Sequence, residues 1–67
     1  MRQSNHKGGW YFVLEYLGFD NKLHTEEFCV FNGACTRQRM LGVEQFTIYQ
    51  RNRFDPETNR VARRGRS

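Results

Sequence analysis

Two neighbouring segments rich in aromatic and branched residues, Trp10–Leu17 and 23–31, most constrain what this chain can fold into. Such composition over eight or nine residues favours β-strands. Between the two segments, Asp20-Asn21 can adopt the left-handed backbone of a tight turn. The sequence therefore predicts an antiparallel hairpin with a two-residue turn, in which Leu14 pairs with Glu27.

This register leaves apolar side chains on both faces of the hairpin. A chain of 67 residues buries only about 60% of its unfolded surface, so it can hardly cover both faces. The second face is predicted to bind a partner, unless the N-terminal lead or the last strand covers it. The predicted partner-binding residues on that face are Tyr11, Val13, Leu17, Phe28 and Val30.

The middle of the chain contains one segment with helical character, residues 34–42. Thr36 or Asn32 would supply its N-terminal cap, and Gly42 suits its C-terminal end. Residues 32–33, Asn-Gly, are expected to form a turn or cap before it.

The C-terminal third is predicted to form a second hairpin. Residues 45–54 alternate in the manner of a strand, and residues 55–59, Asp-Pro-Glu-Thr-Asn, carry a strong turn signal. Residues 60–63 would return as a short fourth strand.

The predicted fold class is therefore α+β, a small antiparallel sheet with one short helix in the order β-β-α-β-β. Residues 1–9 are expected to be a flexible lead, 10–63 a single domain, and 64–67 a disordered basic tail.

Charge is distributed unevenly along the chain. The net charge of +4 resides in residues 51–67, which contain six arginines and two acidic residues, whereas residues 1–50 contain five of each sign. Clustered positive charge attracts polyanions. Nine arginines against two lysines favour planar, bidentate contacts over simple solubility.

The arginines near the third strand are interleaved with aromatic residues, and aromatic rings stack on bases while arginines pair with phosphates or guanine edges. Tyr49, Arg51 and Arg53 would share one face of that strand, and the C-terminal arm would follow a phosphate backbone or an acidic protein surface. The arginines of the arm are Arg60, Arg63, Arg64 and Arg66, and the first three are the predicted contact residues.

The sequence contains no pattern typical of an enzyme or metalloprotein. Cys29 and Cys35, with two isolated histidines, do not have zinc-site spacing, and the cysteines are expected to be core thiols. His24 beside Glu26 lacks a nucleophile and a pocket. We therefore expect no catalytic residue, metal or cofactor.

No segment has the pattern of a signal peptide or the length of apolar sequence that spans a membrane. A cytoplasmic location without membrane association is therefore expected. The chain could be a monomer or a weak homodimer, since two apolar sheet faces suit either.

The layout of residues 10–54 resembles the small host-takeover proteins of lytic bacteriophages. The similarity is carried by the aromatic first strand, the end of the second strand, the single helix and the third strand. The matching segments are Trp10-Tyr11-Phe12-Val13, Phe28-Cys29-Val30-Phe31 and Phe46-Thr47-Ile48-Tyr49. The resemblance implies a regulator that docks on bacterial RNA polymerase, in the host cytoplasm, and inhibits or redirects transcription, for example by antitermination.

Two hypotheses therefore remain at this point. In the first, a regulator docks on RNA polymerase or another nucleic-acid-handling protein through the apolar hairpin, while Arg2, His6 and Lys7 of the lead become ordered on binding. In the second, the chain is a stand-alone domain that binds DNA or RNA through the arginine and aromatic strand and the basic arm.

Overall fold

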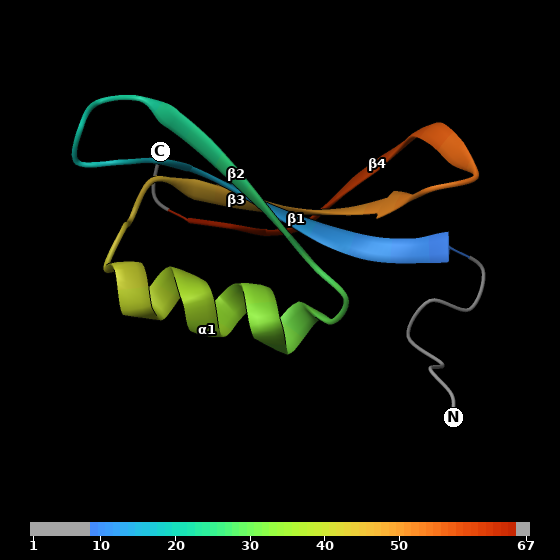
Figure 1. Cartoon of the computed structure of the whole chain (residues 1–67), viewed down its shortest axis with the longest axis horizontal. Helices are drawn as coiled ribbons and strands as arrows, with labels where there is room; N and C mark the ends of the chain where they lie inside the picture. The colour runs from blue at the N-terminus through green and yellow to red at the C-terminus, as the bar shows by residue number, and fades with distance from the viewer. Residues whose placement is uncertain (1–8, 66–67) are drawn as a thin grey trace.

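The computed structural model of the protein describes residues 9–65, except the side chain of Pro56. Within this range an antiparallel sheet of four strands, in the order β2-β1-β3-β4, packs one face against a single helix (Figure 1). The predicted α+β class and β-β-α-β-β order are confirmed. The elements are β1 (Trp10–Leu17), β2 (Leu23–Phe28), α1 (Phe31–Leu41), β3 (Phe46–Asn52) and β4 (Asp55–Arg64).

The core lies between α1 and the two central strands. Leu14 of β1 and Ile48 of β3 are cross-strand partners, and both are 0% exposed. Ala34 and Cys35 of the helix are buried against them in the same cluster. The helix contributes small residues here, so its backbone can approach the sheet closely.

The first hairpin forms at the expected place but with a different register. Leu14 pairs with Glu26 instead of Glu27, and a five-residue connection, 18–22, replaces the two-residue turn. Asn21 adopts the left-handed conformation, φ 67°, and Asp20 Oδ1 accepts a hydrogen bond from the backbone N–H of Lys22 at 3.1 Å. These local contacts lengthen the loop, and the shift by one residue reverses the faces predicted for β2.

The helix begins three residues earlier than predicted. Its N-terminal cap is Val30, which makes no side-chain hydrogen bond, so the predicted caps Thr36 and Asn32 are wrong. The ring of Phe31 in the first turn lies 5.7 Å from that of Phe12, and this contact holds the early turn against the sheet. The predicted C-terminal cap is confirmed, because Gly42 is left-handed at φ 70°.

The second hairpin turns earlier than predicted. Asn52 pairs with Asp55, so the reversal falls at Arg53 and Phe54, and the Asp-Pro-Glu-Thr-Asn segment belongs to β4. Asp55 still organises its neighbours, accepting hydrogen bonds from the backbone of Glu57 and from the side chain of Thr58.

β4 is longer than the predicted strand and includes Arg64, the first residue of the predicted basic tail. The backbone N–H of Gly65 then donates to the carbonyl oxygen of Phe46 at 2.9 Å. Residues 66–67 of the predicted tail and 1–8 of the predicted lead lie outside the described residues.

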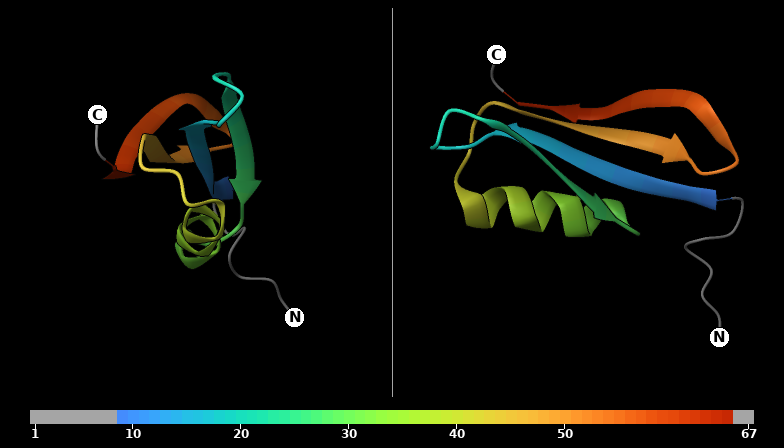
Figure 2. Two further views of the ribbon diagram at one scale, coloured as in Figure 1. Left: turned by 90° about the vertical axis from the view of Figure 1, so that its left-hand side faces the viewer. Right: turned by 45° about the horizontal axis from the view of Figure 1, so that its top comes forward.

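The two faces of the sheet have different surroundings. The helix packs against β1, β2 and β3 on the helix face, and in the described structure no helix covers the opposite face, which we call the open face (Figure 2). The start of β1 and the β3–β4 turn extend beyond the end of α1 (Figure 1). On the central strands, the open face carries Tyr11, Val13, Glu15 and Leu17 of β1 and Thr47, Tyr49 and Arg51 of β3.

Candidate nucleic-acid interface on the open face of the sheet

A stacked tyrosine–arginine pair lies on the open face beside the β3–β4 turn. The guanidinium carbon of Arg53 lies 4.4 Å from the centroid of the Tyr11 ring. Nη2 of Arg53 also lies 3.8 Å from Oε1 of Glu27 on β2. The side chain thus reaches from the turn across β1 and presents a flat cationic group above an aromatic ring.

A second pair lies on the neighbouring strand. The guanidinium carbon of Arg51 is 5.5 Å from the centroid of the Tyr49 ring, and its Nε donates to Oδ1 of Asn59 at 3.1 Å. The Tyr49 hydroxyl donates to Oε1 of Glu15 at 3.3 Å. Both members of this pair are therefore oriented by partners on adjacent strands.

Strand pairing brings the two arginine–tyrosine pairs together. Tyr11 is the direct cross-strand partner of Arg51, and adjacent strands lie only about 4.8 Å apart. Arg64 of β4 faces the same side further along the sheet, opposite Thr47 of β3 and away from the β3–β4 turn. We call the group formed by Tyr11, Tyr49, Arg51, Arg53 and Arg64 the arginine–tyrosine cluster.

The cluster combines two sets of residues that the sequence assigned to different partners. Tyr49, Arg51, Arg53 and Arg64 belonged to the predicted nucleic-acid set, whereas Tyr11 belonged to the apolar docking patch. Strand order explains the difference, because β3 pairs with β1 across a helix-containing connection that sequence periodicity does not reveal.

The rest of the predicted apolar patch does not form one surface. Val13 lies on the open face but is only 3% exposed between its partners Glu27 and Tyr49. Phe28 packs against the core on the helix face, and Val30 is the residue before the helix. Arg2, His6 and Lys7 lie outside the described residues.

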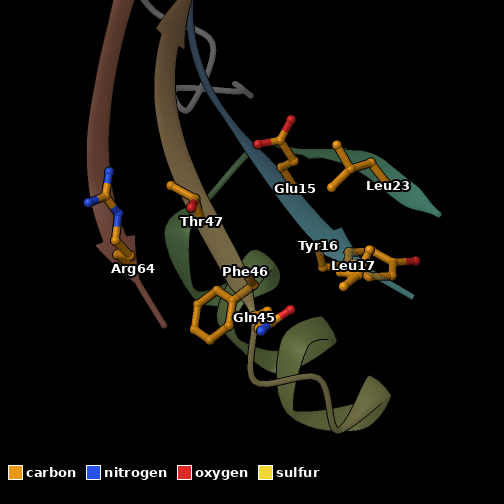
Figure 3. Close-up of a pocket in the computed structure, with 8 residues that line it drawn as sticks. All are labelled: Glu15, Tyr16, Leu17, Leu23, Gln45, Phe46, Thr47 and Arg64. Carbon is orange, nitrogen blue, oxygen red and sulfur yellow. The ribbon is translucent and has the colours of Figure 1, made fainter. Parts of the chain in front are cut away.

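Leu17, the remaining member of that patch, lines an open hollow at the far end of the open face (Figure 3). The hollow has a volume of about 620 Å³, within the range of small-ligand sites. In Figure 3, Leu17 and Leu23 border one side, and Phe46 and Arg64 the other. The hollow is lined by apolar and aromatic side chains together with a few polar and charged ones, which include Glu15 and Arg64.

The predicted arginine arm is divided between the two faces of β4. Arg64 joins the open face, whereas Arg60 pairs with Gln50 and Arg63 with Ile48, on the helix face. Nη1 of Arg63 lies 3.8 Å from the sulfur of buried Cys35. The arm is thus an ordered strand up to Arg64, and its cations point in two directions.

On the helix face, a polar network ties the first hairpin to the helix. Glu26 accepts hydrogen bonds from Nε of Arg37 at 2.9 Å and from the Tyr16 hydroxyl at 3.0 Å. The hydrogen bond from Arg37 lowers the pKa of Glu26 below its usual value and raises that of Arg37. This network links β1, β2 and α1 and has a structural role.

His24 has a different environment from the one that an acid–base role would need. Its Nε2 lies 3.0 Å from Oδ1 of Asp20, and its ring stacks on Tyr16 at 5.3 Å. The hydrogen bond with His24 lowers the pKa of the Asp20 carboxyl. Glu15, the nearest carboxylate along β1, lies on the opposite face of the sheet from His24.

Residues 9–65 contain no cluster of three or more metal-ligating side chains. Over the same residues, no helix combines the length and apolar character that crossing a bilayer demands. The two cysteines of the chain, Cys29 and Cys35, are not joined by a disulfide. Cys35 is buried in the core, as expected, whereas Cys29 is exposed, so the prediction of a core thiol is wrong for Cys29.

Comparison with known proteins adds no assignment. No protein-family model matches the chain, and neither curated proteins nor solved structures give a match. The candidate site is therefore defined by its own geometry.

Proposed function

We propose that this protein is a non-enzymatic binding protein for single-stranded nucleic acid, RNA or DNA, which lies across the open face of the sheet. The observation that carries the proposal is the arginine–tyrosine cluster, in which Arg53 lies over Tyr11 and Arg51 over Tyr49 on adjacent strands.

Each pair offers two kinds of contact to a nucleotide. A base can stack on a tyrosine ring or on the plane of an arginine guanidinium, while the guanidinium N–H groups donate to phosphate oxygens. Exposed surface ion pairs such as that of Arg53 with Glu27 are weak, so a phosphate can replace the carboxylate at small cost. Base stacking requires unpaired bases, and the proposal is therefore specific for single strands.

Fluorescence anisotropy with a labelled single-stranded oligonucleotide and its duplex form tests this function. We expect the single strand to bind more tightly, and Arg53→Ala to weaken its binding. Arg39→Ala is the control, because it removes the same charge from an exposed position on α1 outside the cluster. Equal losses in the two variants, or no binding of any oligonucleotide, would contradict the proposal.

A second candidate function follows from the hollow beside Leu17 and Leu23. In this alternative the protein is a phage-type regulator that inserts an apolar side chain of bacterial RNA polymerase into the hollow and inhibits or redirects the enzyme. Phe19, in the connection between β1 and β2, is 86% exposed and adds apolar surface to this end of the hairpin.

Affinity capture from a bacterial lysate treated with nuclease separates the two candidates. Recovery of polymerase subunits that is lost in Leu23→Asp, a change at an exposed residue, would support the second candidate. Loss of every specific partner on nuclease treatment would favour the first.

A further inference from the structure

A third aromatic–arginine pair lies on the helix face, where neither proposed function uses it. The guanidinium carbon of Arg60 is 6.0 Å from the centroid of the Trp10 ring. Trp10 pairs with Asn52 of β3 and Arg60 with Gln50, so the two side chains meet across β3. Trp10 directly precedes Tyr11 of the open-face cluster, and alternation places these rings on opposite faces of the same strand.

The helix does not cover the part of the sheet's helix face that carries Trp10 and Arg60. α1 begins beside Phe12, which its residue Phe31 contacts, and Trp10 lies two residues further out along β1. Figure 1 shows the start of β1 and the β3–β4 turn extending beyond the helix. Trp10 is accordingly only half-buried, and Arg60 is exposed.

The outer strand, β4, carries arginines on both the open face and the helix face of the sheet. β4 pairs only with β3 in the described sheet, and its arginines alternate, with Arg64 on the open face and Arg60 and Arg63 on the helix face. A polyanion that passes around this edge would therefore meet cations on both sides, and tryptophan offers a large ring for stacking at the end of the path.

Building on the proposed function, we propose that a single-stranded nucleic acid longer than a few nucleotides continues from the open face around the edge of β4. It then stacks a base on Trp10 beside Arg60. The open-face cluster alone holds a short oligonucleotide, and the Trp10–Arg60 pair is a second subsite that only a longer strand reaches. Binding sites of about 4–16 nucleotides are usual for small domains that hold single strands on aromatic platforms.

Trp10 is the only tryptophan in the chain, so its fluorescence reports this subsite directly. The experiment titrates the full chain with a tetranucleotide and a dodecanucleotide of thymidine, and follows the anisotropy of the labelled oligonucleotide and the tryptophan emission in parallel. We expect both oligonucleotides to bind, and only the dodecanucleotide to quench Trp10.

Variants separate direct stacking from an indirect change at Trp10. Arg60→Ala is expected to weaken dodecanucleotide binding by about 3- to 10-fold, the loss expected for one solvent-exposed hydrogen bond, and to leave tetranucleotide binding unchanged. Arg39→Ala, equal in charge, should change neither. Trp10→Leu should give a similar selective loss for the dodecanucleotide.

The outcomes distinguish this inference from the function on which it rests. Absence of anisotropy change with either oligonucleotide overturns both. Dodecanucleotide binding that leaves Trp10 emission unchanged, or that is as tight in Arg60→Ala as in Arg39→Ala, overturns the second subsite and leaves binding on the open face in place.

Discussion

Tyr49 shows at the scale of a single residue how the open face combines order with exposed aromatic surface. Its hydroxyl donates to Glu15 on β1, and Arg51 lies over its ring. The sequence could predict that Tyr49 and Arg51 share a face, because strand alternation is local, whereas Arg53 reaches that face from the turn after β3. It could not predict that Tyr11 joins them, since that depends on the pairing of β1 with β3.

Replacement of Tyr49 separates the role of its ring from that of its hydroxyl. Tyr49→Leu removes the stacking surface, and we expect the affinity for a single-stranded oligonucleotide to fall about 5- to 150-fold, corresponding to about 1–3 kcal/mol per stacked base. Tyr49→Phe keeps the ring and should bind much like the unaltered protein. Anisotropy titrations measure both, with thermal unfolding as a check on folding; equal affinities in the Leu and Phe variants would argue against stacking at this position.

Glu26 makes the stability of the fold depend on pH. The hydrogen bond from Arg37 lowers its folded-state pKa below the ordinary 4.5, so its contribution is fully present above that value. It is lost as pH falls through the lower, folded-state pKa. The Arg37 side chain is 40% exposed, so screening by solvent keeps the contribution of this ion pair small.

Urea unfolding across a pH series tests this assignment. We expect the midpoint of the unaltered protein to fall as the solution is acidified below about pH 4.5, the unperturbed glutamate range, and Glu26→Gln to show a shallower dependence. The part that remains includes Asp20, whose pKa is also lowered, by its hydrogen bond with His24. Glu44→Gln, at an exposed position after the helix, serves as the control. If the unfolding midpoint of Glu44→Gln depends on pH as weakly as that of Glu26→Gln, the role of Glu26 is refuted.

At the scale of elements, local sequence signals predicted which strands and helix form, whereas other contacts determined their boundaries and register. The strand character of the segment beginning at Trp10 and the glycine stop at Gly42 are encoded in a few adjacent residues, and both are confirmed. The register of β2 is different because Asp20 and Asn21 build a five-residue loop. A tight two-residue turn and this longer loop have similar sequence signals, yet they place opposite faces of β2 against the helix.

The same limit applies to the C-terminal hairpin. The Asp-Pro-Glu-Thr-Asn segment has side-chain hydrogen bonds typical of a turn around Asp55, but the chain reverses earlier, at Arg53 and Phe54. The reversal there brings Arg53 over Tyr11. A reversal at the predicted segment would have left Arg53 inside the strand, so the candidate site depends on a turn that the sequence pattern alone placed wrongly.

Gly42 ends the helix through its backbone conformation alone. It is left-handed at φ 70°, and a side chain added there would meet no atom within 4 Å. Gly42→Ala should therefore lower the free energy of unfolding by about 1 kcal/mol through backbone strain, whereas Gly42→Asn should cost less because Asn tolerates this conformation. Chemical denaturation compares the three proteins, and an Ala variant as stable as the Asn variant would exclude this cause.

At the scale of the whole molecule, one short helix covers only part of a twisted four-stranded sheet. The described chain measures 36 × 26 × 17 Å, and the helix is shorter than the sheet against which it packs (Figure 1). Its fully buried large side chains are only Leu14 and Ile48 within residues 9–65. The core is therefore small, and the open face and one end of the helix face are available for binding.

The distribution of arginines over this thin body predicts how binding depends on salt. For single strands, log K falls with log salt concentration with a slope of about −0.7 for each phosphate neutralised. If a short oligonucleotide meets only Arg51, Arg53 and Arg64 on the open face, its slope should be about −2. A longer strand that also meets Arg60 and Arg63 should approach about −3.5.

Anisotropy titrations over a series of potassium chloride concentrations measure these slopes. Arg53→Ala should reduce the slope of both oligonucleotides by about 0.7, and Arg60→Ala only that of the longer one. Arg39→Ala lowers the net charge equally and lies in the last turn of α1, outside the arginine–tyrosine cluster, so it should leave the slope of the short oligonucleotide unchanged. If Arg53→Ala, Arg60→Ala and Arg39→Ala all reduce the slope by the same amount, binding depends on the net charge of the molecule. The positions of the arginines on the two faces of the sheet would then have no influence.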